Sequence, residues 1–564
     1  MAAELTAHAL IAKHRPTLDQ ALEAIRTRAY WSPHPEHPKA YGENGSLDAA
    51  TGKAAFDALL GNRLDLADQP GIDDWVGDEV SPYGIELGVT YPHVDIDVLL
   101  PAMKAGQRAW REAGAELRAM VCLEILKRIS DRTHQFAHAV MHTSGQAFMM
   151  AFQAGGPHAQ DRGLEAVAYA YAEQVRTPET AEWTKPQGKR DPLALTKRFT
   201  PVPRGLALVI GCNTFPTWNG YPGLFASLAT GNAVLVKPHP RAVLPLALTV
   251  QLARQVLAEA GFDPNLVALA AERPGEGIAK TLATRPEIRI IDYTGSTSFG
   301  DWLEANARQA QVYTEKAGVN TVIVHSTDDY KGMLSNLAFS LSLYSGQMCT
   351  TPQNLLIPRD GIRTDQGPKT FDEVSADLAR AVDGLLGDDA RANALLGAIV
   401  NPDVKARLEA AAGLGEVALA SREISNPEFP GAVVRTPVVV KLDGAKPDDQ
   451  AAYMSECFGP VSFAVAVDSA GDAVELLRRT VREKGAMTVG AYTTDPEVER
   501  AIEEVCLEEA AQLSLNLTGG VYVNQTAAFS DFHGSGGNPA ANAALTDGAF
   551  VANRFRVVEV RRQA

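Results

Sequence analysis

Residues 205–238 read GLALVIGCNTFPTWNGYPGLFASLATGNAVLVKP and contain two short apolar runs, one at 206–210 and one at 233–237. Glycine, asparagine or proline bounds each run, as is typical of a short buried strand. The same pattern returns further along the chain, where strand-like runs alternate with helical segments. That alternation predicts a parallel sheet with crossover helices, and therefore an α/β fold.

The pattern extends over most of the chain. Residues 95–175 carry apolar side chains at three- and four-residue steps and are predicted to be helical. Residues 244–261 form another predicted helix. Further predicted strands lie at 265–271, 287–295, 321–326, 438–442, 463–468, 487–493 and 521–525. The C-terminal residues 550–564 alternate like an edge strand, a kind of strand that can add to a partner's sheet.

Residues 1–94 differ in character from the rest of the chain. The segments at 30–45 and 67–84 are rich in proline, glycine and other turn-forming residues. We expect a short helix at 18–28, followed by an irregular extension that wraps the core rather than a separate domain.

Composition excludes several classes of protein. The 564 residues carry a formal net charge of −16, which argues against a general nucleic-acid binder. No signal peptide is recognised near the N-terminus, and no apolar run is long enough to predict a membrane helix. Five scattered cysteines without a CxxC pair suit a reducing compartment, so we predict a cytoplasmic protein.

Three residues are candidates for the chemistry. Cys349 follows Gly346 and precedes a polar segment, and it is either a nucleophile in a loop or a buried thiol before a strand. Asn213 follows the first predicted strand, where it is either an oxyanion donor or an ordinary turn residue. Glu315 is a candidate general base if its carboxylate approaches Cys349, and otherwise a solvated charge.

Other residues fit a nucleotide site. Lys237 ends a strand at the carboxyl edge of the predicted sheet, where ligands of open α/β sheets bind. Gly295 and Ser296 open a strand-to-helix turn of the kind that binds a pyrophosphate, although the GxGxxG fingerprint is absent. Glu456 and Phe458 place a carboxylate and a ring together before another strand. Each of these patterns also occurs in turns without a ligand.

Three histidines form a possible metal pattern. His134, His138 and His142 lie at i, i+4 and i+8 on one predicted helix, and a pair at i, i+4 can chelate zinc. No HExxH pattern or third carboxylate ligand accompanies them, and three side chains on one straight helix diverge. We therefore predict no metal site.

The order of the motifs resembles the aldehyde dehydrogenase superfamily from about residue 95 to the C-terminus. The matching segments are NTFP at 213–216, VKP at 236–238, YTGSTSFG at 293–300, Glu315 with Gly318, GQMCTTPQ at 346–353, ECFGPV at 456–461 and VYVN at 521–524. The resemblance implies a Rossmann-type cofactor domain, an α/β catalytic domain and a small β oligomerisation arm.

The resemblance also implies a role for each candidate. Cys349 would attack the aldehyde, with Asn213 holding the oxyanion and Glu315 activating the water that hydrolyses the thioester. The resemblance also implies which residues contact the cofactor. Lys237 and Glu456 would bind ribose hydroxyls, Gly295 and Ser296 would meet the pyrophosphate, and Phe458 would pack against the cofactor.

Two departures from the family pattern matter. Many NAD-preferring relatives place a glutamate three residues after the lysine, but this chain has Pro240 there and Arg241 next. Because a 2′-phosphate would no longer be repelled and an arginine could pair with it, we predict NADP as the preferred cofactor, with NAD possible. In addition, EKAGVN replaces the usual ELGG with a charged Lys316 and a single glycine, a change that can alter the orientation of Glu315.

The predicted division is an N-terminal extension at 1–94, a cofactor domain at 95–175 and 201–320, an arm at 176–200 and 540–564, and a catalytic domain at 321–539. The arm implies a homodimer or higher oligomer. Within the superfamily, the chain resembles the phenylacetate-degradation branch, which implies 3-oxo-5,6-dehydrosuberyl-CoA semialdehyde as substrate. A coenzyme A-acylating enzyme and an inactive scaffold are the alternatives, and no nucleic-acid or membrane partner is expected.

Overall fold

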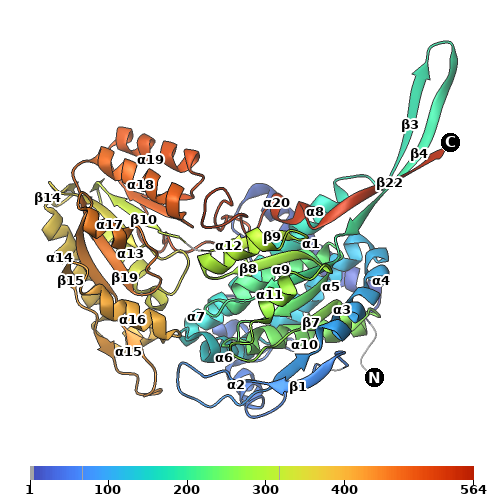
Figure 1. The fold of residues 1–564 in the computed structure, drawn as a ribbon, viewed down its shortest axis with the longest axis horizontal. Helices are drawn as coiled ribbons and strands as arrows, with labels where there is room; N and C mark the ends of the chain where they lie inside the picture. Colours follow the sequence, from blue (N-terminus) through green and yellow to red (C-terminus); the bar gives the residue numbers. More distant parts are fainter. Residues whose placement is uncertain (1–4, 67, 317) are drawn as a thin grey trace.

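The computed structural model describes residues 5–66, 68–316 and 318–564. Two lobes lie side by side, and a narrow β arm projects from one of them (Figure 1). Each lobe is built around one mainly parallel sheet, so the predicted α/β fold class is confirmed. The division into domains stays a prediction.

The first lobe contains a five-stranded parallel sheet in the order β7-β6-β5-β8-β9. Its strands are β5 (Leu206–Ile210), β6 (Ala233–Lys237), β7 (Val267–Leu269), β8 (Ile288–Thr294) and β9 (Gln311–Glu315). The crossover helices are α9 (Pro216–Ala229), α10 (Leu244–Glu259), α11 (Ile278–Ala283) and α12 (Thr297–Asn306). β5 and β6 are fully buried, which explains their continuous apolar runs.

Helices from the first half of the chain complete this lobe. They are α3 (Ile96–Ala105), α4 (Gln107–Glu112), α5 (Gly114–Ser130), α6 (Thr133–Ser144), α7 (Phe148–Gln153) and α8 (Ala159–Val175). α8 packs against α9 and α5, so it connects this helical layer to the crossover helix beside the sheet.

The second lobe contains a seven-stranded sheet in the order β15-β18-β19-β12-β10-β20-β21, parallel except for β15. The strands are β10 (Thr321–Val324), β12 (Asn354–Pro358), β15 (Glu416–Leu419), β18 (Val438–Asp443), β19 (Val461–Val467), β20 (Val489–Tyr492) and β21 (Leu513–Leu515). The helices are α13 (Tyr330–Ser342), α14 (Phe371–Leu386), α15 (Asp389–Leu396), α16 (Pro402–Ala411), α17 (Pro447–Tyr453), α18 (Ala470–Lys484) and α19 (Pro496–Glu508).

The predicted strand at 521–525 is wrong. These residues form turns, and their backbone carbonyls are bound by side chains rather than by another strand. Asn336 donates to the Val521 carbonyl oxygen at 2.6 Å, and Thr350 donates to the Asn524 carbonyl oxygen at 2.8 Å. The alternating apolar pattern therefore belongs to a loop held by polar side chains.

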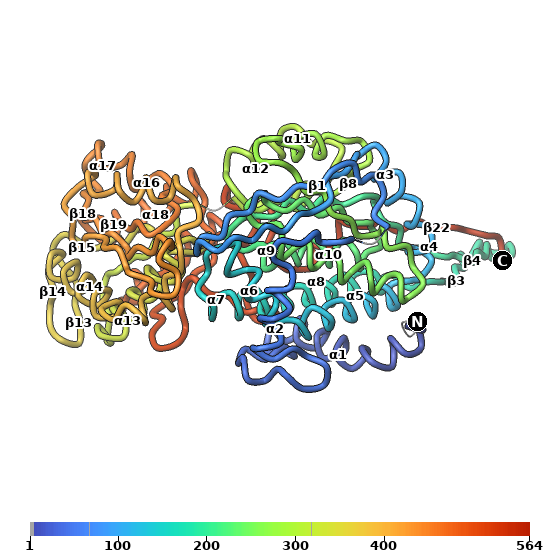
Figure 2. The backbone as a smooth tube through the Cα atoms, turned by 90° about the horizontal axis from the view of Figure 1, so that it is seen from below, coloured from blue at the N-terminus to red at the C-terminus, as the bar shows by residue number. Residues whose placement is uncertain are grey.

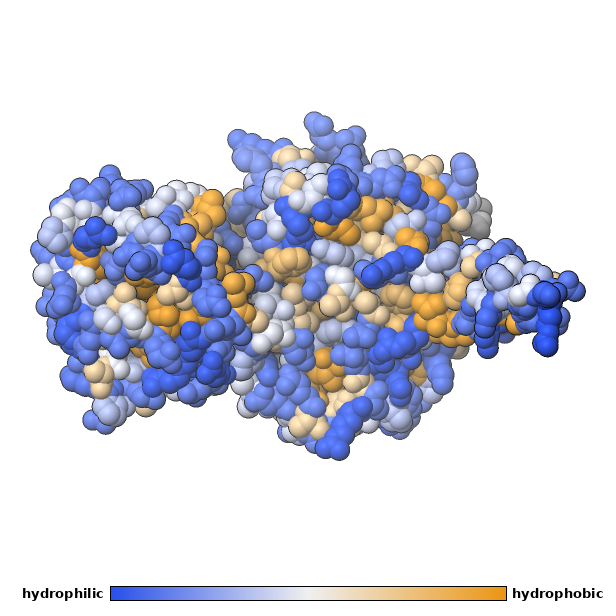
Figure 3. Space-filling view, turned by 90° about the horizontal axis from the view of Figure 1, so that it is seen from above, coloured by the Kyte–Doolittle hydropathy of each residue, from blue (hydrophilic) through white to orange (hydrophobic). Residues whose placement is uncertain are grey.

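The projecting arm is a three-stranded antiparallel sheet in the order β22-β4-β3. Its strands are β3 (Thr180–Gln187), β4 (Arg190–Pro203) and β22 (Phe555–Gln563), and the short helix α20 (Gly548–Ala552) precedes β22. The predicted C-terminal edge strand is confirmed as β22. Seen from above, apolar residues cluster where the arm leaves the lobe (Figure 3).

The N-terminal extension lies along the helices of the first lobe (Figure 2). It contains α1 (Ala7–Thr27), α2 (Ala49–Asp57) and the antiparallel pair β1 (Ile72–Val76) and β2 (Tyr91–Val94). The predicted helix at 18–28 was too short, because α1 begins at Ala7 and contains Pro16 in its interior. Packing of α1 against α5 and α8 stabilises the helix despite the missing backbone donor. No helix in the described ranges is long and apolar enough to cross a membrane.

Candidate active site

Cys349 follows a turn with an unusual backbone. Tyr344, Ser345 and Gly346 all have left-handed φ angles of 53°, 50° and 65°. The Tyr344 and Ser345 side chains donate hydrogen bonds to backbone carbonyls of neighbouring segments and so hold this turn. A Cβ on Gly346 would lie 2.4 Å from the Gly459 carbonyl oxygen, so only glycine permits this close approach.

Asn320 fixes the loop from its other side. Its amide nitrogen donates to the carbonyl oxygens of Cys349 and Thr351, at 2.7 and 3.0 Å. Its amide oxygen accepts from the backbone N–H groups of Met487 and Thr488. One buried asparagine therefore binds the cysteine loop to the segment that leads into β20.

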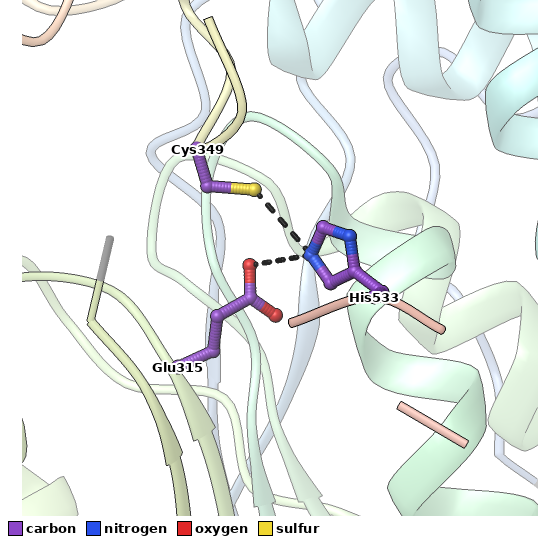
Figure 4. A group of neighbouring side chains, drawn as sticks. All are labelled: Glu315, Cys349 and His533. Atoms are coloured by element: carbon purple, nitrogen blue, oxygen red, sulfur yellow. Dashed lines mark hydrogen bonds and ion pairs between the residues drawn. The ribbon is translucent and has the colours of Figure 1, made fainter. Parts of the chain in front are cut away.

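Three side chains from distant segments converge at this loop (Figure 4). Cys349 Sγ lies 3.6 Å from His533 Nε2, and the same nitrogen lies 3.1 Å from Glu315 Oε1. One ligating atom from each of the three lies within 4.8 Å of the others. Glu315 ends β9 at the carboxyl edge of the five-stranded sheet, and the structure brings its carboxylate near Cys349, the condition for its candidacy as a general base.

The charges of the cluster favour a thiol and a carboxylate. Burial raises the pKa of Cys349 well above its ordinary value, and the negative charge of Glu315 raises it further. Burial alone would raise the pKa of Glu315, but the charge and hydrogen bond of His533 lower it below its ordinary value. A proton acceptor is therefore needed before Cys349 can attack.

His533 was missed by the sequence analysis. It lies in an irregular loop without a helix or strand, and α8 holds that loop through two buried charges. Glu165 accepts the Phe529 backbone N–H at 3.0 Å, and Arg162 donates to the Asp531 carbonyl oxygen at 3.1 Å. No local pattern marks this histidine, although the glycines just after it indicate a tight loop.

Helix α9 supplies two more groups to the cluster. Asn219 donates its amide N–H to Glu315 Oε2 at 2.9 Å, which fixes the carboxylate. The Trp218 ring meets the His533 ring edge-on, with 4.6 Å between centroids. Both side chains follow the NTFP turn by a few residues, and neither was predicted to take part.

Asn213 also has a defined contact. Its amide nitrogen donates to the Thr143 carbonyl oxygen at 3.1 Å. No described hydrogen bond joins Asn213 to Cys349, so its oxyanion role stays a prediction. Lys316 turns away from the cluster and pairs with Asp301 and Glu304 at 2.9 and 3.2 Å, so it does not displace Glu315.

Cys349 lines two pockets. The larger has a cavity volume of about 320 Å³ and is also lined by His533, Trp218 and Trp31. The smaller has a cavity volume of about 20 Å³ and is also lined by Glu456 and Phe458. Cys349 is therefore shared by both pockets, and two predicted cofactor residues lie with it in the smaller one.

The other predicted cofactor residues follow strands of the five-stranded sheet. Ser296 precedes the first turn of α12 and is exposed, next to Gly295, whose N–H donates to the Glu315 carbonyl oxygen at 3.0 Å. A Cβ on Gly295 would lie 2.4 Å from the Tyr293 hydroxyl oxygen. An exposed helix N-terminus at the carboxyl edge of a parallel sheet fits the pyrophosphate of a dinucleotide.

Lys237 ends β6 and forms a buried ion pair with Glu272. Glu272 also accepts the backbone N–H of Ile278, at the start of α11, at 2.9 Å. This carboxylate was not predicted. Pro240 and Arg241 follow in a turn, and the Arg241 side chain is exposed.

The three histidines of α6 lie in an aromatic layer. The rings of His138 and His142 stack on Phe56 at centroid distances of 5.7 and 5.3 Å. Burial lowers the pKa of both to about 4. Within the described ranges, the only group of three His, Cys, Asp or Glu ligand atoms within 4.8 Å of one another is Glu315, Cys349 and His533.

Known proteins match this chain in sequence and in fold. Residues 90–546 match the model of the aldehyde dehydrogenase family. The crystal structure of an NAD-dependent aldehyde dehydrogenase from Burkholderia multivorans superposes with a TM-score of 0.95, is 56% identical and covers 99% of both chains.

Two curated relatives are more distant. Benzaldehyde dehydrogenase [NAD(+)] from Pseudomonas putida is 25% identical over 393 residues, which span 68% of this chain and 73% of the relative. The 2-aminomuconic 6-semialdehyde dehydrogenase from a Pseudomonas species is 24% identical over 438 residues, which span 74% and 82%.

Proposed function

The chain belongs to the aldehyde dehydrogenase family and is an oxidoreductase that acts on aldehydes; from that premise we propose that Cys349 carries the acyl intermediate and that Glu315 directs its hydrolysis to a carboxylic acid. The observation that carries the proposal is the convergence of the Cys349, Glu315 and His533 side chains at a place where Cys349 lines two pockets.

His533, in the neutral form whose Nε2 carries no hydrogen, supplies the proton acceptor that the buried thiol needs. The positive charge that lowers the pKa of Glu315 is the one that His533 gains with that proton. The Cys349 proton moves to Nε2 across 3.6 Å, and the resulting imidazolium donates that N–H to Glu315 Oε1 at 3.1 Å. Charge-assisted hydrogen bonds are roughly twice as strong as neutral ones, so this bond favours the transfer. The thiolate is then free to attack the aldehyde carbon.

The aldehyde oxygen gains negative charge as the C–S bond forms. The Cys349 backbone N–H and the Asn213 amide are the proposed donors to that oxygen. An amide nitrogen carries two hydrogens, and the contact with Thr143 uses one, so the second can serve the oxyanion.

The residues of the sheet edge and of the smaller pocket fit a dinucleotide. Lys237, Ser296 and Glu456 would hold its ribose and phosphate groups, and Phe458 would pack against it. When bound, a nicotinamide cofactor supplies the hydride acceptor that allows a thioester to remain on Cys349.

Glu315 then takes a proton from water, and the resulting hydroxide attacks the thioester carbon and releases the acid. The lowered pKa of Glu315 keeps it ionised for this role. Superfamily members that transfer the acyl group to coenzyme A commonly lack this glutamate, so its presence favours hydrolysis.

The experiment that tests the reaction uses Glu315→Gln. We expect one burst of reduced cofactor per active site, followed by no turnover, because acylation proceeds and hydrolysis does not. Turnover that requires coenzyme A in the unmodified enzyme would establish the acylating alternative. Full activity of Cys349→Ala would contradict every role assigned to the sulfur, and an inactive unmodified protein would favour a scaffold.

The choice between NAD and NADP depends on two opposing features. Pro240 and the exposed Arg241 favour the 2′-phosphate of NADP, as predicted from the sequence. The Glu272 carboxylate beside Lys237 opposes it, and the 56%-identical Burkholderia protein is described as NAD-dependent. The ratio of kcat/KM for the two cofactors decides the preference. Arg241→Ala should lower kcat/KM for NADP, and Glu272→Gln should raise kcat/KM for NADP.

For the substrate, we propose a semialdehyde of phenylacetate degradation. The N-terminal extension and the EKAGVN segment resemble the phenylacetic acid degradation protein PaaN, which implies 3-oxo-5,6-dehydrosuberyl-CoA semialdehyde. The larger pocket has room for its carbon chain, and Tyr30 and Trp31 of the extension line that pocket. Arg162 and His158, two basic side chains that line the pocket, are paired with carboxylates, so the coenzyme A phosphates would lie outside the pocket.

Comparing this thioester with the free semialdehyde and with benzaldehyde tests the assignment. We expect the highest kcat/KM for the thioester. A higher value for benzaldehyde would transfer the assignment to a simple aromatic aldehyde.

The arm supports a homodimer or a higher oligomer. Leu193, Val557 and Val558 on its strands are 49%, 40% and 48% exposed, which suits a surface that another copy covers. Light scattering of the purified protein tests this state. We place the enzyme in the cytoplasm, where its five free cysteines remain reduced.

A further inference from the structure

The Cys349, Glu315 and His533 cluster has the spacing of a tetrahedral metal site. Zinc bound to sulfur at about 2.3 Å and to nitrogen or oxygen at about 2.0–2.1 Å places its donor atoms roughly 3.3–3.6 Å apart. The observed separations are 3.6 Å between Sγ and Nε2 and 3.1 Å between Nε2 and Oε1. The third separation is no more than 4.8 Å, so a small rotation of Glu315 completes the set.

The chemistry and support of these donors also suit zinc. Thiolate, imidazole and carboxylate form a mixed set that zinc accepts, whereas magnesium and calcium prefer oxygen ligands alone. Asn219 holds the second oxygen of Glu315, and Trp218 packs against the His533 ring, so two of the ligands are already oriented. The larger pocket, which Cys349 and His533 both line, gives the ion a path to the cluster and would admit water as a fourth ligand.

We propose that this cluster is an inhibitory site for a borderline-soft divalent cation, with Zn²⁺ as the chemical type. On binding, Cys349 releases its proton to the solvent and the sulfur forms a bond to the metal, with no change of oxidation state. The nucleophile is then unavailable to the aldehyde, and removal of the metal restores it. The inference builds on the proposed role of Cys349, but metal binding is measurable without the reaction.

Direct binding is the first test. Reduced, chelator-treated full-length protein is titrated with Zn²⁺ by calorimetry and with Co²⁺ by absorption. We expect one ion per chain and a thiolate-to-cobalt charge-transfer band with visible bands of tetrahedral intensity. Cys349→Ser should remove the charge-transfer band, and His533→Ala should weaken Zn²⁺ binding at least about tenfold.

Matched controls separate this site from other thiols and imidazoles. Cys457→Ser changes a thiol in the neighbouring small pocket, and His138→Ala changes a histidine of α6; both should keep the affinity of the unmodified protein. Circular dichroism confirms folding of each variant, and His533→Gln provides a second, more conservative change. Unchanged zinc affinity in both His533 variants, or an unchanged charge-transfer band in Cys349→Ser, would overturn the proposal.

Inhibition is the second test. Micromolar Zn²⁺ should slow alkylation of Cys349 by iodoacetamide, and EDTA should restore the rate, whereas Mg²⁺ should have no effect. Equal protection by Mg²⁺ would contradict a site built on sulfur and nitrogen. If the protein binds Zn²⁺ as expected but oxidises no aldehyde, the proposed function fails while the metal site stands.

Discussion

The α6 histidines and the single histidine of the Cys349 cluster have opposite surroundings. His138 and His142 follow each other along one helix, stack on Phe56 and have their pKa lowered to about 4 by burial. His533 lies in an irregular loop and meets a thiol and a carboxylate from distant segments. The regular spacing therefore marks packing, while the isolated histidine lies at the chemistry.

The largest effect on activity is expected from a change of Cys349. Contact with this thiol distinguishes His533 from the α6 histidines. Cys349→Ala should lower kcat/KM by at least about a thousandfold, because loss of a nucleophile removes the covalent route. Steady-state assays with one aldehyde measure the change. Cys506→Ala, which changes a buried thiol on α19 outside both pockets, is the control, and an equal loss there would indicate general damage to the fold.

His533 itself should matter for rate more than for stability. We expect His533→Ala to lower kcat by roughly 100-fold, the usual range for loss of a general base, with a small change in Tm. Added imidazole should restore part of the activity if the cavity admits it. A variant with full activity and an unchanged alkylation rate of Cys349 would remove the proton-transfer role.

The α6 histidines should show the reverse behaviour. His142→Ala removes a ring that stacks on Phe56 and lies 3.1 Å from the Ser81 hydroxyl. We expect a loss of about 1–3 kcal/mol in the free energy of unfolding, with kcat/KM within about twofold of the unmodified enzyme. Denaturant unfolding and the standard assay measure both quantities. A hundredfold loss of activity would erase the distinction between the groups.

The same layer predicts a pH dependence of stability. Because the folded pKa of His138 and His142 is about 4 and the ordinary value is 6.5, the unfolded chain takes up protons first as pH falls. The stabilisation is complete above pH 6.5 and is lost between pH 6.5 and 4. The double variant with leucine at both positions should flatten this part of the unfolding curve, and an unchanged slope would refute the assignment.

The smallest effect on the kinetics is expected from the residues of the N-terminal extension that line the larger pocket. Trp31 lines that pocket and meets Phe529 edge-on at 5.1 Å, a few residues before His533. Trp31→Ala should raise KM for a large aldehyde several-fold and leave KM for acetaldehyde almost unchanged. Equal changes for both substrates would place the effect on the His533 loop instead of the pocket wall.

Part of this site was accessible from the sequence. Strands of a parallel sheet present their carboxyl ends at one edge, so Glu315 at the end of β9 could be expected near a ligand. The structure places Gly346, which directly precedes the QMC segment in the sequence, against the Gly459 backbone. Strand ends and glycines are visible as local patterns, although the sequence alone does not decide between a nucleophile and a buried thiol at Cys349.

The rest depended on contacts between distant segments. His533 is 184 positions from Cys349, and the α8 pair Arg162 and Glu165 holds its loop, so no local spacing reveals it. Residues 521–525 alternate like a strand, yet polar side chains bind their carbonyls. Helix α1 continues through Pro16 because one of its faces packs on α5 and α8.

We propose that the acyl group forms on Cys349 and stays bound to it until Glu315 activates the water that hydrolyses the thioester. The most direct measurement is mass spectrometry of Glu315→Gln, quenched with acid after one exposure to aldehyde and oxidised cofactor. The account predicts one acyl adduct per chain, located on the peptide that contains Cys349, and one equivalent of reduced cofactor. Reduced cofactor without an adduct, or an adduct on another residue, would contradict it.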